Sequence, residues 1–414
     1  MDLYLYNSLT KQKELFTPID KKEVKLYTCG ITAYDYAHIG HGRKYIMDDI
    51  LKRTLEYNGF KVNHVQNVTD VGHLVSDADE GEDKLEKGAK KQGKTVWEVA
   101  EFFTNDFYQT MDKLNIQRPS IICKATDHIN EQIELIEKLF KNGYAYDTLE
   151  AVYFDTSKFA DYGKMFGQKI EDKKLGVRSE VKTDENKRNG ADFALWFKRI
   201  GKFKDHIMHW DSPWGDGFPG WHIECSAMSM KYLGEQIDIH TGGEDHLSIH
   251  HPNEIAQSEG ATGKKPFSKF WEHYAFLTVD GTKMSKSLGN YYSVQDVIDK
   301  KIDPTALRFL YLGAHYKKPM NFTWQALDSA AKGLNNLKLK VKSLKTSERT
   351  VLSEEKDNKI QDYREKFNQA LNDDLNTSKA MAVLFEMIKS NIPSEDKYDL
   401  ALLFDEVLGL NLKH

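Results

Sequence analysis

Residues 24–68 of the chain read VKLYTCGITAYDYAHIGHGRKYIMDDILKRTLEYNGFKVNHVQNV. Residues 24–28 alternate apolar and polar side chains, as a half-buried strand does, and end at a Cys-Gly pair. Apolar residues then recur at helical spacing over about residues 41–57, and residues 61–68 have the pattern of a second strand. This β–loop–helix–β order predicts a parallel α/β sheet that binds ligands at the carboxyl ends of its strands.

Length and composition limit the class of protein. At 414 residues the chain is expected to form two to three domains. It has no run of about 18 uncharged apolar residues, and its first residues lack the apolar segment of a signal peptide, so we expect a cytoplasmic protein. The net charge of −5 predicts no general affinity for nucleic acid, so an RNA partner would need a local basic face. Three cysteines are too few, and odd in number, for a disulfide framework.

The pattern changes near residue 119. A helix is expected at about residues 130–142, followed by short strands and a polar stretch at residues 171–190 that we interpret as a surface loop. Residues 236–240 have the pattern of a further strand, and the chain after Trp324 has helical periodicity throughout. Residues 77–94 carry a dense mixture of charges, which is typical of a solvated helix or loop.

The segment AHIGHGR at residues 37–43 places His38 and His41 at the start of a helix. Backbone N–H groups and the positive helix end favour phosphate there, and the imidazoles can donate to oxygens that gain charge as pyrophosphate leaves. Gly40 allows backbone and ligand to approach closely. Considered alone, a glycine-rich turn with two exposed histidines explains this segment equally well.

A second segment, KMSKS at residues 283–287, lies about 240 residues later between two turn signals. Lys283 and Lys286, with Ser285 between them, stand on a loop of small residues that can close over a triphosphate and neutralise its charge. The two segments occur in this order, with a strand–loop–helix before the first, which favours a nucleotide site over a basic surface loop. Together they predict an enzyme that uses ATP to form an adenylate.

This pair of segments resembles the motifs of class I aminoacyl-tRNA synthetases. The resemblance implies an α/β fold with a Rossmann-type parallel-sheet catalytic domain split by a connective insertion, followed by an α-helical C-terminal domain. We expect the catalytic halves at residues 1–118 and 205–275, with the insertion at residues 119–204. The KMSKS loop and stem-contact region would span residues 276–325, and a short tRNA-binding helical domain residues 326–414.

Four dispersed residues have donor atoms that suit a metal. Cys29 ends the first strand, Cys225 lies in GWHIECS, and His250 and Glu254 are four residues apart. Two thiolates, an imidazole and a carboxylate can bind Zn²⁺ tetrahedrally. The spacing is not that of a zinc finger, so spacing alone favours the other interpretation, buried cysteines and a histidine pair at a helix start.

Three stretches resemble cysteinyl-tRNA synthetase: TCGIT at residues 28–32, GWHIECSAMS at 220–229 and HTGGEDHLSIHHPNEIAQSE at 240–259. The resemblance implies one zinc ion on Cys29, Cys225, His250 and Glu254, to which the substrate thiolate also binds. It further implies that Cys29, Thr69, Trp221 and Asp245 form the cysteine pocket, with Asp245 binding the ammonium group. His38, His41, Lys283 and Lys286 would be catalytic, and these four with Gly40 and Ser285 would bind ATP and its Mg²⁺.

The chain departs from that family at several positions. Pro252 replaces a usually acidic residue and suits a first helical turn, so the helix is expected to begin at Pro252 with His250 just outside it. His251 is then a competing metal ligand. Residues 71–94 diverge from the family, and we interpret His73 as a structural or surface residue. Cys123 is most simply a small core residue.

The leading hypothesis is a cysteine–tRNA ligase that forms cysteinyl-adenylate and transfers cysteine to the 3′ end of tRNA(Cys), as a monomer. A cysteine ligase that couples the adenylate to an amino-sugar, as in mycothiol biosynthesis, would share every motif. A non-catalytic RNA-binding paralogue is a third hypothesis. The first C-terminal helix carries Lys332, Lys338, Lys340, Lys342 and Lys345, which form either a tRNA-binding side or a solvated face. The short tail predicts that a separate anticodon-binding domain is absent or reduced.

Overall fold

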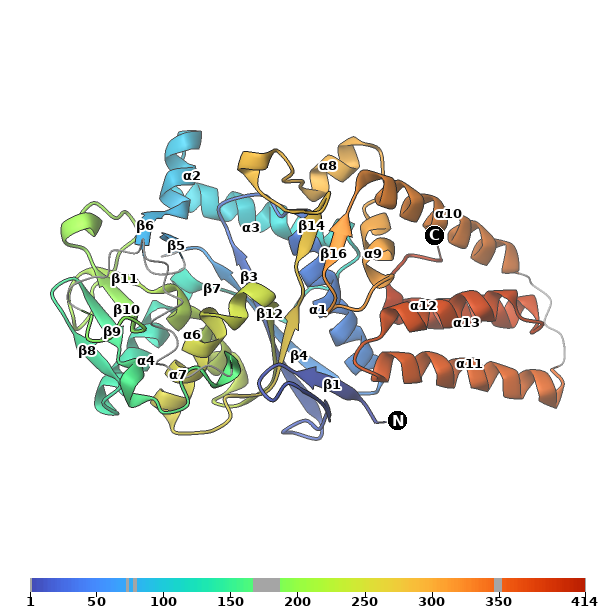
Figure 1. Ribbon diagram of the computed structural model, residues 1–414, viewed down its shortest axis with the longest axis horizontal. Helices are drawn as coiled ribbons and strands as arrows, with labels where there is room; N and C mark the ends of the chain where they lie inside the picture. Colours follow the sequence, from blue (N-terminus) through green and yellow to red (C-terminus); the bar gives the residue numbers. More distant parts are fainter. Residues whose placement is uncertain (1, 72–73, 77–79, 167–186, 346–351, 414) are drawn as a thin grey trace.

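The computed structural model describes residues 2–71, 74–76, 80–166, 187–345 and 352–413. A five-stranded sheet with the order β13-β12-β3-β4-β7 forms its centre (Figure 1). These strands are Ser268–Tyr274, Ile237–Gly243, Glu23–Thr32, Lys61–Thr69 and Ile121–Lys124. All four neighbouring pairs are parallel, which confirms the predicted Rossmann-type sheet. The chain order reverses between β3 and β12, and ligands bind at such a switch point, beyond the carboxyl ends of the strands.

Helices cover both faces of this sheet. α1 (Ile39–Tyr57) and α3 (Val96–Lys113) pack together on one face, where the ring centroids of Tyr45 and Phe107 are 4.8 Å apart. α4, α6 and α7 pack together on the other face; they span Ile129–Lys141, Trp221–Leu233 and His250–Thr262. Adjacent residues of β12 point to opposite faces, since His240 contacts α7 while Thr241 contacts α1. A polar residue of this strand can therefore reach the helices of either layer.

The insertion forms a separate antiparallel sheet of the order β11-β10-β9-β8. Its strands are Gly217–Pro219, Phe193–Lys198, Ala151–Phe154 and Ala145–Asp147. It has its own small core, which includes Tyr146, Phe197 and Phe218. The expected insertion at residues 119–204 differs from this arrangement at both ends, because β7 pairs with β4 in the parallel sheet and β11, after residue 204, pairs with β10.

A three-stranded sheet of order β15-β14-β16 and two short helices follow the parallel sheet. The strands are Leu277–Val279 (β14), Thr282–Lys283 (β15) and Met320–Phe322 (β16), and the helices are Val294–Asp299 (α8) and Thr305–Leu312 (α9). The buried guanidinium of Arg308, on α9, donates to Asp49 of α1 and to the Leu408 carbonyl at the end of the last helix. This arginine fixes the C-terminal helices to α1.

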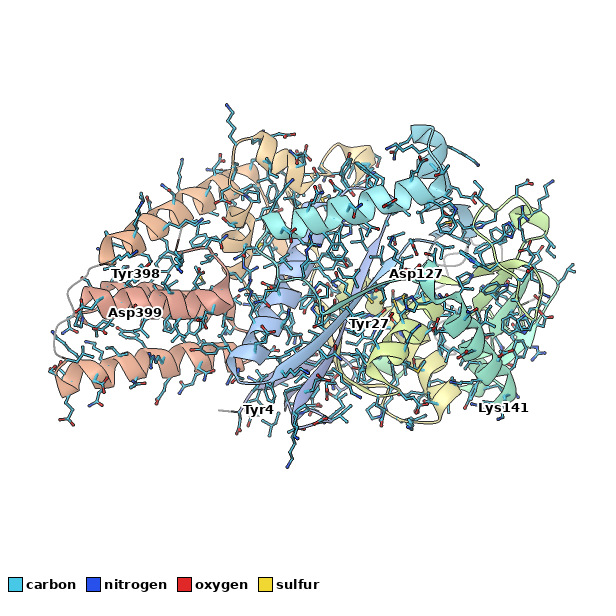
Figure 2. The ribbon with its side chains drawn as sticks, turned by 180° about the vertical axis from the view of Figure 1, so that it is seen from behind. Tyr4, Tyr27, Asp127, Lys141, Tyr398 and Asp399 are labelled. Atoms are coloured by element: carbon cyan, nitrogen blue, oxygen red, sulfur yellow. The ribbon has the colours of Figure 1, made fainter. Side chains whose placement is uncertain are left out.

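Four helices form the C-terminal part, at the right of Figure 1. They are Trp324–Leu344 (α10), Glu354–Asn372 (α11), Thr377–Lys389 (α12) and Ser394–Leu408 (α13). The apolar residues that predicted helices here are buried, among them Leu334, Leu337 and Phe367. The predicted α-helical C-terminal domain is confirmed. In the view from behind, Tyr398 and Asp399 mark α13 within this bundle (Figure 2).

The remaining elements are small. β1 (Tyr4–Asn7) and β2 (Gln12–Leu15) form an antiparallel hairpin at the N-terminus. β5 (Leu74–Ser76) and β6 (Glu80–Asp83) pair ahead of α2 (Lys84–Gln92). His73 and most of the polar stretch at residues 171–190 lie outside the described residues. Among the described helices, none has the length and apolarity needed to cross a membrane.

Candidate functional site

The HIGH segment, His38–His41, caps helix α1 with its own side chains. Nδ1 of His38 accepts a hydrogen bond from the His41 N–H at 3.0 Å, and Nδ1 of His41 accepts one from the His38 N–H at 3.4 Å. Because each Nδ1 acts as an acceptor, the hydrogen of each neutral ring is on Nε2. The start of α1 therefore offers two imidazole N–H donors, one from Nε2 of each histidine.

The protonation of these rings is set by their surroundings. Burial lowers the pKa of His38 to about 4. Burial, together with the neighbouring His38, lowers the pKa of His41 well below its usual range. Both rings are therefore neutral at pH 7, so they act as hydrogen-bond donors and leave the positive charge of the site to lysines.

The KMSKS loop, residues 283–287, leaves the short β14–β15 hairpin and is held by Asn290. The Asn290 side chain accepts from the Ser285 N–H at 2.8 Å and donates to the Lys283 carbonyl at 3.2 Å. The hydroxyl groups of Ser285 and Ser287 are 2.8 Å apart. The asparagine that marked a turn in the sequence thus sets the path of the whole loop.

This loop lies directly against the HIGH segment. The Ile39 N–H donates to the Tyr292 carbonyl at 2.9 Å, and His38 forms a β-bridge with Ser293. A Cβ on Gly40 would lie 3.3 Å from the methyl group of Met284, so a glycine leaves the space that this side chain needs. Two segments about 240 residues apart in the sequence form one surface.

The two lysines of the KMSKS loop stand on its exposed side. The Lys286 ammonium group contacts the carboxylate of Asp35 and lies 5.0 Å from the ring centre of Tyr291. Asp35 belongs to the same loop as His38, so this ion pair links the lysine to the HIGH segment. A polyphosphate that entered here would meet the lysines and the imidazole donors together.

A buried cluster of four donor side chains lies at the switch point. The ligand atoms of Cys29, Cys225, His250 and Glu254 all lie within 4.8 Å of one another, and each of these residues is buried. Cys29 comes from β3, Cys225 from α6, and the other two from α7. Beside the cluster is the ring of Tyr27, which lies at the centre of the molecule in Figure 2.

The chemistry of this cluster fits a metal cation. Oε1 of Glu254 is buried 3.0 Å from Nε2 of His250 and accepts no hydrogen bond from any described residue. A carboxylate oxygen buried without a hydrogen-bond donor is suited to bind a cation. Burial raises the pKa of the Cys29 thiol, but its contact with Cys225 and the nearby imidazoles have a larger and opposite effect. The net pKa lies well below its usual range. Two sulfur donors, one imidazole and one carboxylate form a set that suits zinc.

Helix α7 begins at His250, so the expectation that it begins at Pro252 is wrong. Proline occupies the third position of the first turn, where it has no need of an intrahelical N–H bond. His250 and Glu254 are consequently one turn apart on the same helix face. His251 also reaches the cluster, with Nε2 3.5 Å from the sulfur of Cys29, and it belongs to a second donor set with His240.

Of the other residues expected in a cysteine pocket, Trp221 contacts the cluster, and Thr69 and Asp245 lie on neighbouring elements. The indole ring of Trp221 stacks on His250 at 4.2 Å. Thr69, at the end of β4, donates to Oε2 of Glu224 at 2.9 Å. Asp245 is exposed, in a short 3-10 helix that follows β12, and its charge acts on the pKa of His38. The metal cluster and the HIGH segment therefore face one shared region.

Comparison with known proteins identifies the family. Residues 15–332 match the family model described as tRNA synthetases class I (C) catalytic domain, and residues 366–391 match the DALR domain. The Cysteine--tRNA ligase of Treponema denticola is 47% identical over 100% of this chain and 87% of its own length. The chain belongs to the cysteine–tRNA ligase family.

Other members of the cysteine–tRNA ligase family show similar agreement. The Chlorobium chlorochromatii enzyme is 46% identical over 94% of this chain and 79% of its own length. Among solved structures, methionyl-tRNA synthetase of Mycobacterium tuberculosis with methionyl-adenylate has a TM-score of 0.64 at 15% identity, covering 94% of this chain and 90% of that chain. That likeness shows the fold alone.

Sequence reasoning missed several histidines that lie around the cluster. His222 contacts His250 through their Nδ1 atoms at 2.9 Å, and His273 contacts His251 at 2.7 Å. Nε2 of His240 lies 2.9 Å from Oε2 of Glu254. These histidines orient the donor side chains. His222 and His240 lie within the quoted stretches 220–229 and 240–259, which was the available sign, whereas His273 lies on β13 outside them.

Proposed function

We propose that this chain activates L-cysteine with ATP and transfers the cysteinyl group to the 3′ end of tRNA(Cys). The observation that carries the proposal is that one strand–loop connection bears both a thiol of the metal cluster and the HIGH segment, against which Met284 of the KMSKS loop lies. Cys29 and His38 come from the same strand–loop connection, nine residues apart. A substrate bound at the cluster would present its carboxylate to an ATP bound by the HIGH segment.

The residues of the nucleotide site would position ATP and neutralise its charge, and none of them would form a covalent bond with it. His38 and His41 would donate from Nε2 to the phosphate oxygens that gain charge, and Lys283 and Lys286 would neutralise the polyphosphate with Mg²⁺. Gly40 and Ser285 are small, so they would allow ATP to approach the backbone closely. The cysteine carboxylate attacks the α-phosphorus and pyrophosphate leaves, so no protein nucleophile is required.

Zinc would be held by Cys29, Cys225, His250 and Glu254. Of the two adjacent histidines, we assign His250, because it belongs to the set that contains both thiols, whereas His251 belongs to the set with His240. When bound, the ion favours a thiolate over an alcohol and lowers the pKa of a thiol. Rejection of serine by about 10⁴-fold corresponds to about 5.5 kcal/mol, more than pocket shape alone supplies for isosteres.

The rest of the cysteine pocket is assigned from position. Trp221 would cover the substrate side chain, since its ring already stacks on His250. Asp245 would bind the substrate ammonium group, and Thr69 would line the pocket at the end of β4.

The tRNA would bind to the helices that follow the KMSKS region. Lys332, Lys340, Lys342 and Lys345 are exposed on α10, while Lys338 is half-buried and bonds to Asp303. Phosphate contacts by such lysines orient a nucleic acid without reading its sequence. We further propose that β8–β11 form the connective unit, that the chain acts as a monomer, and that it resides in the cytoplasm; light scattering and cell fractionation test the last two.

Two assays on the purified full chain test this function. We expect cysteine-dependent ATP–pyrophosphate exchange, little exchange with serine, and transfer of radiolabelled cysteine to tRNA(Cys). Exchange without transfer to tRNA, together with transfer to an amino-sugar, would instead show a mycothiol-type ligase. No exchange with any amino acid would show a binding protein and overturn the proposal. Metal analysis should find one zinc per chain.

A further inference from the structure

Strand β3 carries a bulge at the point where it presents Cys29. The register of β3 with β4 shifts between Thr28 and Ile31, so Cys29 and Gly30 lie outside the regular ladder. On the other side, the pairing of β3 with β12 ends at Thr28 and Thr241. Cys29 therefore has no partner in the regular register of either neighbouring strand, and side chains contribute to holding it.

Two side chains hold this bulge. The Lys44 ammonium group donates to the Cys29 carbonyl at 2.5 Å. The Asn67 amide oxygen accepts from the Gly30 N–H at 2.8 Å. A Cβ on Gly30 would lie 1.5 Å from the Asn67 carbonyl oxygen, so only glycine allows β4 to come this close. Lys44 lies on α1, one turn after the HIGH segment, whereas Asn67 lies within the sheet.

Lys44 is itself fixed by a buried partner that reaches the opposite strand. Its ammonium group forms an ion pair with Asp48 at 2.7 Å, and these side chains are 12% and 4% exposed. The other carboxylate oxygen of Asp48 accepts from the Thr241 hydroxyl at 2.6 Å. Thr241 is the last residue of β12 that pairs with β3. The Lys44–Asp48 pair thus spans the two strands at the point where their own hydrogen bonds end.

We propose that Lys44 and Asp48 are positioning residues that hold the Cys29 backbone against β12 and thereby set the geometry of the metal and cysteine site. The inference rests on the proposed zinc site at Cys29. A charged ammonium bonded to a carbonyl and a carboxylate in a buried place is a strong and directional contact. Because both residues belong to the helix that the HIGH segment begins, the same element orients the nucleotide donors and the thiol ligand.

The test compares three variants in the full chain. Lys44→Met keeps the length of the apolar stem but removes the donor, and we expect its zinc affinity, measured by chelator competition, to fall by about tenfold or more. The KM for cysteine in ATP–pyrophosphate exchange should rise in parallel, while the KM for ATP stays within about twofold. Lys44→Arg keeps a charged donor and should retain most of the zinc affinity.

The double variant Lys44→Met/Asp48→Asn separates positioning from stability. It removes the carboxylate that Lys44→Met leaves buried without its partner, so thermal stability should recover. The asparagine oxygen can still accept from Thr241, but the bond to Cys29 stays absent, so zinc affinity should remain low. Recovery of zinc affinity together with stability would overturn the proposal, because the pair would then act only through its buried charge.

A matched control lies on the same helix. Lys52 is also buried and donates to the Arg118 carbonyl at 3.1 Å, away from Cys29. Lys52→Met should lower stability without changing zinc affinity or the KM for cysteine. Zinc affinity of Lys44→Met equal to that of the unaltered chain would overturn this proposal alone. An unaltered chain that binds no zinc would overturn the metal assignment and this proposal together.

Discussion

The imidazole rings of His38 and His41 are stacked, with centroids 3.5 Å apart and planes inclined by 18°. Each ring accepts a hydrogen bond from the backbone N–H of the other residue. The two histidines therefore have a structural task at Nδ1 and keep Nε2 for a ligand. A side chain that accepts the backbone hydrogen bond but has no donor in the place of Nε2 should therefore preserve stability and lose catalysis.

Asparagine is such a side chain at position 38. It caps helices as well as any residue, but its amide lies too close to the backbone to replace the Nε2–H donor. We expect His38→Asn to lower the rate of adenylate formation by about 10²- to 10³-fold, with the melting temperature nearly unchanged. Pyrophosphate exchange and thermal unfolding measure these quantities. A rate within threefold of the unaltered chain would remove His38 from the mechanism.

Lys286 is expected to serve the nucleotide and not the metal. Because it lies on the exposed KMSKS loop against Asp35, Lys286→Ala should depress adenylate formation strongly and leave zinc content unchanged. Lys264→Ala is a matched control, since Lys264 is an exposed lysine paired with Glu235. Equal loss of exchange activity and of zinc would contradict this division of roles.

Glu254 is the donor whose removal most directly tests the metal cluster. It is fully buried between His250 and His240, so Glu254→Gln should weaken zinc binding and abolish cysteine activation. Glu259→Gln on the same helix, where the carboxylate accepts from the Phe267 N–H, is the control. Dialysis of the unaltered chain against a chelator should abolish cysteine-dependent exchange, and added Zn²⁺ should restore it. Persistence of exchange after complete zinc removal would disprove the assignment.

Acid should destabilise the chain through His64. Its ring is buried and bonds to the Thr28 hydroxyl at 2.9 Å, and burial lowers its pKa from 6.5 to about 3. Below pH 6.5 the unfolded chain binds this proton and the folded chain does not, so stability falls as the pH falls toward 3. The slope is about 1.4 kcal/mol per pH unit. Urea unfolding measures the loss in the free energy of unfolding between pH 7 and pH 5. We expect this loss to be about 2 kcal/mol smaller in His64→Gln than in the unaltered chain, provided that the variant folds.

The lysines of α10 should affect tRNA and leave amino acid activation unchanged. Replacing Lys332, Lys340 and Lys342 by alanine should raise the KM for tRNA, lower the salt dependence of aminoacylation by about one unit of slope per lost phosphate contact, and preserve pyrophosphate exchange. The corresponding triple change at Lys356, Lys359 and Lys366 of α11 is the control. An unchanged KM for tRNA would show that the α10 lysines form only a solvated face.

Much of the parallel sheet was predictable because its elements follow one another in the sequence. The strand–loop–helix–strand order of residues 24–68 predicted α1 and β4 to within two residues, whereas β3 runs to Thr32, four residues beyond the predicted end at residue 28. The predicted insertion includes β7, which has only four residues and lies at the sheet edge, where Ile122 is 41% exposed. A short edge strand carries too little periodicity to identify its sheet.

The site was predictable by residue type but not by arrangement. The motifs and the resemblance identified the donor residues. Positions in the sequence could not show that Met284 packs against Gly40 or that Lys44 reaches the Cys29 carbonyl. Both contacts join elements that are adjacent only after the sheet has formed. The start of α7 was misjudged because proline fits any position of the first helical turn, so it marks a helix start only approximately.

The split of the parallel sheet by the insertion has a consequence for the order of assembly. Cys29 precedes the insertion and the other three cluster residues follow it, so neither half of the catalytic domain contains the full donor set. Pairing of Leu26 with Ile239 closes a loop of more than 200 residues, which is an entropically costly and slow event in folding. A nascent chain should therefore bind the ion tightly only after its parallel sheet is complete. A nascent chain stalled within the insertion should not yet retain the ion.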